Sequence, residues 1–100
     1  MATLHTVNKS PFQAGALSSC LAHIKEGDTV LMIEDGIYGA LTGTGFSDKV
    51  QASGAKICVL GPDVSARGID TAHILASVET VDYDGFVDLA AASARVQAWL

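Results

Sequence analysis

The sequence predicts a single small α/β domain whose strands form a parallel sheet with flanking helices. Short apolar runs typical of strands alternate along the 100 residues with segments that have helical spacing or helix-boundary residues. The runs at residues 30–33 and 57–60 are apolar, as is typical of parallel strands that are covered on both faces. Such an alternation joins neighbouring strands by right-handed crossovers.

Glycine and proline between the apolar runs set the order of the elements. Strands are expected at residues 2–7, 28–34, 55–60 and 79–83. Short helical segments are expected at residues 36–41, 46–52, 63–67 and 71–76. The glycines at 43 and 45 are interpreted as a turn, because they follow a helix and lack the third glycine of a dinucleotide-binding loop.

Two longer helices are expected near the ends of the chain. The first should run from Ser10, as its N-cap, to about Glu26, and its apolar stripe consists of Leu17, Leu21 and Ile24. The last should begin at an Asp84 cap, with Phe86, Leu89, Ala90 and Ser93 towards the core. Trp99 and Leu100 then form an apolar C-terminus that either covers the core or docks on another subunit.

The composition favours a protein that works within an assembly. Apolar residues make up 49% of the chain, and charged residues make up only 17%. A small domain hides so much apolar surface poorly, and exposed apolar patches mark interfaces. The net charge of −5 argues against direct nucleic-acid binding, which needs clustered lysine and arginine. We expect no signal peptide, membrane span or disulfide scaffold, and therefore a cytoplasmic location.

Cys20 is the best candidate for covalent chemistry. A helical wheel places it about 60° from Leu17, at the edge of the apolar stripe, with His23 one turn further on. A partly exposed thiol beside an imidazole can have a lowered pKa, and the thiolate is the reactive form. The alternative is a small apolar side chain at the edge of the core, which is common for free cysteine. Cys58, inside a buried strand, is expected to be inert.

The other polar residues favour structural roles. Glu34 and Asp35 are adjacent on an extended segment and should point to opposite faces, so Asp35 is expected to cap the following helix. Arg67 either binds an anion, pairs across an interface, or is a solvated charge at a helix end. The three histidines and two cysteines show no paired zinc spacing. We expect neither a metal nor a cofactor.

Four segments, taken together and in order, resemble the DsrH/TusB family. They are LHTVNKSPF at 4–12, GDTVLMIEDGIY at 27–38, DVSARG at 63–68 and VDYDGFVDL at 81–89. The resemblance implies one domain over residues 1–100 with a DsrE-like, flavodoxin-like or Rossmann-like topology. It implies a subunit of a cytoplasmic α2β2γ2 heterohexamer with DsrE/TusD-like and DsrF/TusC-like partners. That complex passes sulfur as a cysteine persulfide, with a DsrC/TusE-like protein as acceptor.

The resemblance leaves the role of this chain open. A cysteine at the place of Cys20 resembles the DsrH branch, which implies oxidation of stored sulfur, with Cys20 as a persulfide carrier. His23 or a partner's cation would then stabilise the thiolate for thiol–persulfide exchange. The TusB branch instead implies relay towards 2-thiouridine at the tRNA wobble position. A structural subunit without catalysis is the alternative, because the main sulfur-accepting cysteine belongs to the DsrE/TusD-like partner. A small flavodoxin-like ligand binder is a more distant third class.

Overall fold

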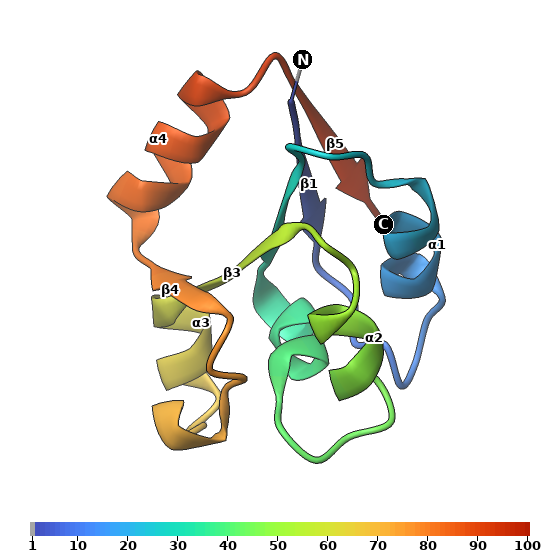
Figure 1. The fold of residues 1–100 in the computed structure, drawn as a ribbon. Coiled ribbons are helices and arrows are strands. Elements are labelled where there is room, and N and C mark those ends of the chain that lie inside the picture. The colour runs from blue at the N-terminus through green and yellow to red at the C-terminus, as the bar shows by residue number, and fades with distance from the viewer. Residues whose placement is uncertain (1) are drawn as a thin grey trace.

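The computed structural model describes residues 2–100, whose strands form one parallel sheet in the order β4-β3-β2-β1-β5 (Figure 1). All neighbouring strands pair in parallel, so that Leu4 lies beside Thr29, for example, and Val7 beside Trp99. The strands are β1 (Thr3–Val7), β2 (Thr29–Met32), β3 (Lys56–Leu60), β4 (Glu79–Val81) and β5 (Arg95–Trp99). The predicted parallel α/β sheet is confirmed.

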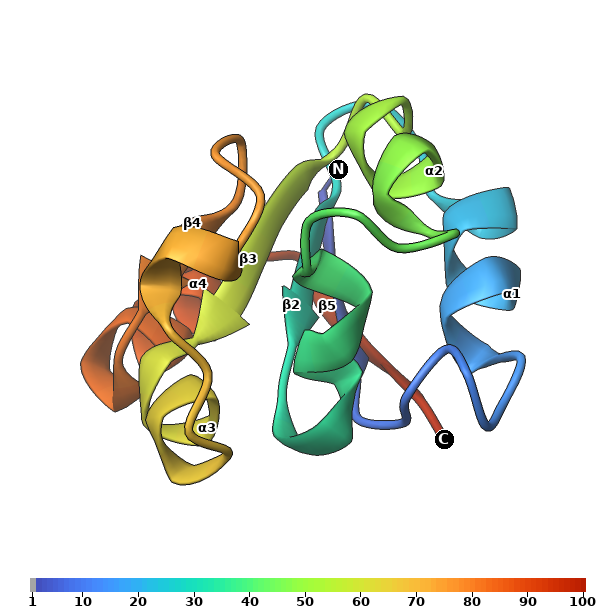
Figure 2. The same cartoon turned by 90° about the horizontal axis from the view of Figure 1, so that it is seen from below.

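Helices cover both faces of this sheet. They are α1 (Ala16–His23), α2 (Ser47–Gln51), α3 (Gly61–Ala66), α4 (Tyr83–Ala92) and the 3-10 helices η1 (Glu34–Ala40) and η2 (Thr71–His73). Figure 2 shows α1 and α4 on opposite sides of the strands. Within residues 2–100, no helix has the length and apolar character needed to cross a membrane.

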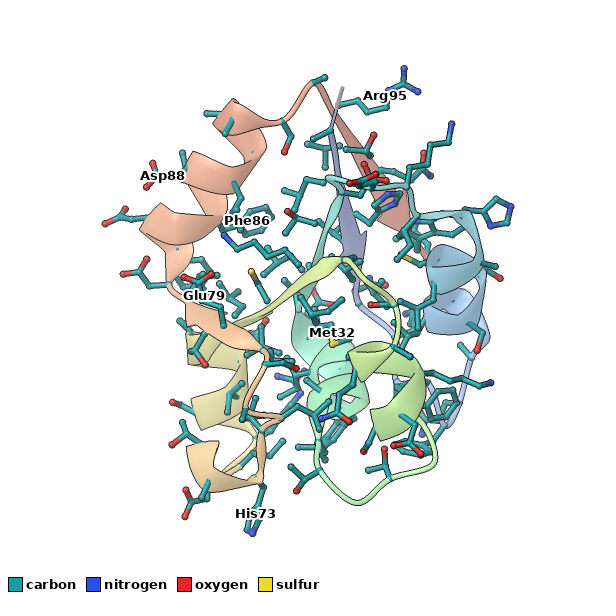
Figure 3. The ribbon with its side chains drawn as sticks, viewed as in Figure 1. Met32, His73, Glu79, Phe86, Asp88 and Arg95 are labelled. Atoms are coloured by element: carbon teal, nitrogen blue, oxygen red, sulfur yellow. The ribbon has the colours of Figure 1, made fainter. Side chains whose placement is uncertain are left out.

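Two apolar clusters, one on each face, hold the helices to the sheet. The larger cluster packs α1, η1, α2 and α3 against side chains such as Val30 and Val59. The smaller cluster packs the inner side of α4 against Leu4, Leu31 and Cys58. Successive side chains along a strand point to opposite faces of the sheet, which assigns neighbouring strand residues to different clusters. The expected inner face of the last helix is confirmed for its apolar members, Phe86, Leu89 and Ala90 (Phe86 in Figure 3).

The first helix is shorter than expected, and Ser10 does not cap it. The Ser10 hydroxyl accepts a bond from the Phe12 amide at 3.2 Å, and its carbonyl accepts from Gln13 and Ala14 at 3.1 Å. These hydrogen bonds of Ser10 therefore stabilise an isolated turn before the helix. The helix proper begins at Ala16, because Gly15 is costly inside a helix and stands instead at its N-cap.

The cap of the last helix also differs from the expectation. Asp82, not Asp84, is the N-cap of α4, and its carboxylate accepts a bond from the Gly85 amide at 2.8 Å. Asp84 lies within the first turn instead. The two aspartates lie two residues apart, and aspartate is favoured both as an N-cap and in the first turn of a helix. Local residue preference alone therefore does not decide which of them is the N-cap.

The fifth strand was not expected. β5 follows α4 and adds to the free side of β1, so that it is an edge strand. Its side chains are exposed except for the half-buried Trp99, which packs against the larger cluster. Residues 95–98 alternate polar and apolar side chains, which is the sequence signal of a strand. The interpretation of the C-terminus as a simple cover for the core is therefore incomplete.

Candidate functional site

Cys20 lies on the inner face of α1 and is fully buried. Its side chain has 0% exposure and packs within the larger cluster, so the expected partial exposure is wrong. The two buried residues of α1 are Leu17 and Cys20, which places the centre of the buried stripe between them. The helix ends at His23, and Leu21 and Ile24, the other expected members of the stripe, pack against the same cluster in partly buried positions.

The environment of Cys20 keeps its thiol neutral. Burial raises the pKa of Cys20 to about 12, and the negative charge of Asp28 adds to the rise. This direction is opposite to the one expected for a reactive thiol. Burial also raises the pKa of Cys58, which lies on β3 within the smaller cluster. The two free cysteines therefore belong to opposite faces of the sheet.

His23 is turned towards its own helix and the C-terminal strand. Its Nδ1 lies 2.7 Å from the carbonyl oxygen of Ser19. A carbonyl oxygen only accepts, so Nδ1 carries the hydrogen and Nε2 is left free. The imidazole also stands 5.6 Å from the ring of Trp99, between ring centres. The structure thus groups His23 with Trp99, and its role as stabiliser of a Cys20 thiolate stays a prediction.

A hydrogen-bond network near His23 links β1, the residue directly before β2, and β5. The His5 Nε2 lies 2.9 Å from an Asp28 carboxylate oxygen, and the Trp99 indole nitrogen lies 3.0 Å from the His5 Nδ1. An indole N–H can only donate, so the His5 Nδ1 accepts and its Nε2–H donates to Asp28. This geometry assigns a neutral His5 with one defined tautomer.

Asp28 is the central acceptor of this hydrogen-bond network. Its carboxylate accepts bonds from the His5 ring, the Thr3 amide at 2.9 Å and the Lys25 amide at 3.0 Å. The bond from His5, followed by the two backbone bonds, lowers the pKa of Asp28 to about 2 despite its burial. A buried carboxylate at neutral pH is thereby kept ionised and fully bonded.

A cavity of about 560 Å³ opens beside this hydrogen-bond network, between the end of α1 and strand β5. The side chains around it include His5, His23, Lys25, Asp28, Arg95 and Trp99. This is the candidate site of the chain, and it combines cations, a bonded carboxylate and aromatic rings.

The sequence interpretation did not find this site. A histidine within the first strand and an aspartate directly before the next strand were its only local signals. The pairing of β1 with β2 brings His5 and Asp28 together across 23 positions, and Trp99 is 94 positions from His5. Without the fifth strand, nothing placed Trp99 beside His5.

Polar residues at the carboxyl ends of β2 and β3 form a separate cluster. Asp35 does not cap η1 but accepts a bond from the Arg67 Nε at 2.9 Å. Asp63 accepts from the Glu34 amide at 2.6 Å and holds Glu34 at a left-handed φ of 50°. Arg67 thus pairs within the chain, which corrects the expected capping by Asp35 and the interpretation of Arg67 as a solvated charge.

Comparison with known proteins decides the family. The family model described as DsrH like protein matches residues 9–96. Protein TusB of Pectobacterium parmentieri is 36% identical over 96 residues, which is 96% of this chain and 99% of that protein. Protein TusB of Cronobacter sakazakii is 33% identical with the same coverage of both chains. This chain belongs to the DsrH family.

Solved structures support the fold of this chain. The ychN protein of E. coli superimposes with a TM-score of 0.78 at 14% identity, over 98% of this chain and 99% of that one. Protein MTH1491 of Methanobacterium thermoautotrophicum, described as of unknown function, gives a TM-score of 0.68 at 15% identity over 96% of each chain. Both likenesses confirm the predicted fold class.

The burial of Cys20 in this DsrH-family chain predicts its behaviour towards thiol reagents. Under native conditions at neutral pH, iodoacetamide is expected to leave both Cys20 and Cys58 unmodified, and both should react once the chain is unfolded in urea. Peptide mass analysis after timed labelling measures this. Rapid labelling of Cys20 in the folded chain, with Cys58 still protected, would contradict the prediction.

Proposed function

We propose that this chain is a structural subunit of a cytoplasmic sulfur-relay complex, in which a partner subunit carries the principal reacting cysteine. Membership of the DsrH family supports the relay role. The complex would be the heterohexamer with DsrE/TusD-like and DsrF/TusC-like subunits, and a DsrC/TusE-like protein would accept the sulfur.

The state of Cys20 is the observation that carries the structural role. Persulfide exchange needs a thiolate that can approach the outer sulfur of a persulfide. With a pKa raised to about 12 and no exposed surface, Cys20 offers neither ionisation nor access. A carrier role for Cys20, with His23 as thiolate stabiliser, would need partner binding to shift α1 away from the sheet.

The two branches of the family differ in the destination of the sulfur. The similar proteins from Pectobacterium parmentieri and Cronobacter sakazakii bear the name TusB, which supports relay towards tRNA 2-thiouridine. The cysteine at position 20 supports the DsrH branch and oxidation of stored sulfur. Measurement of thiolated tRNA and of stored-sulfur consumption in a strain that lacks this chain separates the two destinations.

Substitution of Cys20 in the reconstituted heterohexamer tests the role of this chain. Cys20→Ala and Cys20→Ser are expected to leave the rate of sulfur transfer within about twofold of the unmodified complex, because the reacting thiol is elsewhere. Cys58→Ala is the matched control for loss of a buried thiol, and size exclusion confirms assembly.

A different result would identify a carrier. Transfer that falls more than about tenfold in both Cys20 variants, with intact assembly and normal transfer in Cys58→Ala, would overturn the structural role. Mass analysis of the complex isolated without reductant gives a second measure. Extra sulfur is expected on a partner's cysteine peptide, and extra sulfur on the Cys20 peptide would support the carrier role instead.

A further inference from the structure

The cavity between α1 and β5 gathers positive charge in an acidic chain. Of the six lysines and arginines, Lys25 and Arg95 line it, together with two of the three histidines. Its one acidic lining residue, Asp28, accepts bonds from three donors on its two oxygens. The opening therefore presents cations to a ligand, although the chain as a whole carries a net charge of −5.

The fold does not use these two cations. Within residues 2–100, Lys56 pairs with Glu79 and Arg67 with two aspartates, whereas the side chains of Lys25 and Arg95 form no salt bridge. Both residues are exposed, and Figure 3 shows Arg95 reaching outward from the start of β5. A guanidinium matches two oxygens of a phosphate, and an ammonium adds a second charge, so the pair suits a phosphate dianion.

Aromatic rings form the wall of the cavity next to these cations. The Trp99 ring lies 5.6 Å from the His23 ring and 6.1 Å from the His5 ring, between centres. The Trp99 N–H is already bonded to His5, so a ligand in the cavity can contact the indole only through its ring and not through a donor. Flat aromatic surfaces of this kind stack on nucleobases.

We propose that this cavity binds a nucleoside monophosphate, with its phosphate held by Lys25 and Arg95 and its base against Trp99 and His23. The volume of about 560 Å³ is within the usual range for small-molecule sites. A pair of free cations in an acidic chain suits one phosphate group rather than the repeated phosphates of a polynucleotide. This site is separate from the sulfur-relay role proposed above and does not depend on it.

Trp99 makes the test direct, because it is the only tryptophan in the chain. Its fluorescence is recorded while the 100-residue chain is titrated with AMP, adenosine or inorganic phosphate. AMP is expected to give a saturable change with a dissociation constant below about 1 mM, and adenosine should bind at least about tenfold more weakly. Inorganic phosphate should compete with AMP, and added salt should weaken AMP binding.

Charge removal tests the position of the site. The double variant Lys25→Gln, Arg95→Gln is expected to bind AMP at least about tenfold more weakly, and the exposure of both side chains should leave the fold intact. The matched control, Lys9→Gln with Lys49→Gln, removes the same charge from residues outside the cavity and should bind like the unmodified chain. The absence of any AMP-dependent change up to about 10 mM would overturn the proposal, as would equal binding of adenosine or equal weakening in both double variants.

Discussion

Replacement of Asp28 by alanine is expected to lower the free energy of unfolding by about 3 kcal/mol. Three donors lose their acceptor at once, and each bond to a buried charge contributes about 1 kcal/mol or more. The donors are the His5 ring and the Thr3 amide, both on β1, and the Lys25 amide, which lies just after α1. Urea unfolding followed by circular dichroism measures the change.

A matched control separates this network from a general effect of losing a carboxylate. Asp88 lies on the exposed side of α4 and points away from the sheet (Figure 3), and Asp88→Ala should change the free energy of unfolding by less than about 0.5 kcal/mol. Trp99 fluorescence gives a second readout, because loss of Asp28 releases the His5 tautomer that accepts the indole N–H. Equal unfolding free energies of the two variants would show that the hydrogen bonds to Asp28 contribute little to stability.

The same carboxylate predicts a loss of stability in acid. The pKa of Asp28 is about 2 in the folded chain, against an ordinary value of 3.8. Because the folded value is the lower one, its contribution is complete above the ordinary value and is lost as the pH falls towards 2. Between pH 5 and pH 2, the free energy of unfolding should therefore fall more for the unmodified chain than for Asp28→Ala. The difference in unfolding free energy between the two proteins should become smaller as the pH falls.

The sequence predicted the parts of this fold that depend on local pattern. The buried runs of β2 and β3 carry their own signal, since parallel strands that are covered on both faces are apolar at consecutive positions. The same pattern fails for β5, where one side of the strand stays open and Arg95 and Gln97 alternate with small apolar residues. The expected exposure of Cys20 was wrong for another reason. The helical wheel assumed a helix from Ser10 to about Glu26, whereas α1 spans Ala16–His23.

The candidate site depends on contacts that no local pattern contains. His5 on β1, Asp28 directly before β2, and Trp99 on β5 meet only after the order β2-β1-β5 is set. Cys20 shows the converse case, in which the folded chain buries a thiol that the sequence pattern placed at the edge of the core. Burial and the nearby Asp28 carboxylate raise its pKa, and both follow from tertiary packing rather than from neighbours in the sequence.

Replacement of Gly36 by alanine is expected to have the largest effect of any small substitution in this chain. Gly36 is buried in η1, and a Cβ at this position would overlap the carbonyl oxygen of Val7 and lie 2.8 Å from its carbonyl carbon. The Val7 oxygen also accepts a bond from the Ile33 amide at 3.0 Å, which ties the end of β1 to the segment after β2. A shift of the Val7 carbonyl that relieved the overlap would therefore disturb that bond.

The expected loss exceeds about 3 kcal/mol, a large part of the total stability of a small domain. Gly36→Ala should therefore lower the midpoint of thermal unfolding strongly or prevent recovery of soluble protein. Gly45→Ala is the matched control, because within residues 2–100 no heavy atom beyond Gly45 and its chain neighbours lies within 4 Å of the Cβ it would add, and it should unfold like the original chain. If both variants unfold at the same temperature, the close approach of η1 to β1 does not constrain the fold.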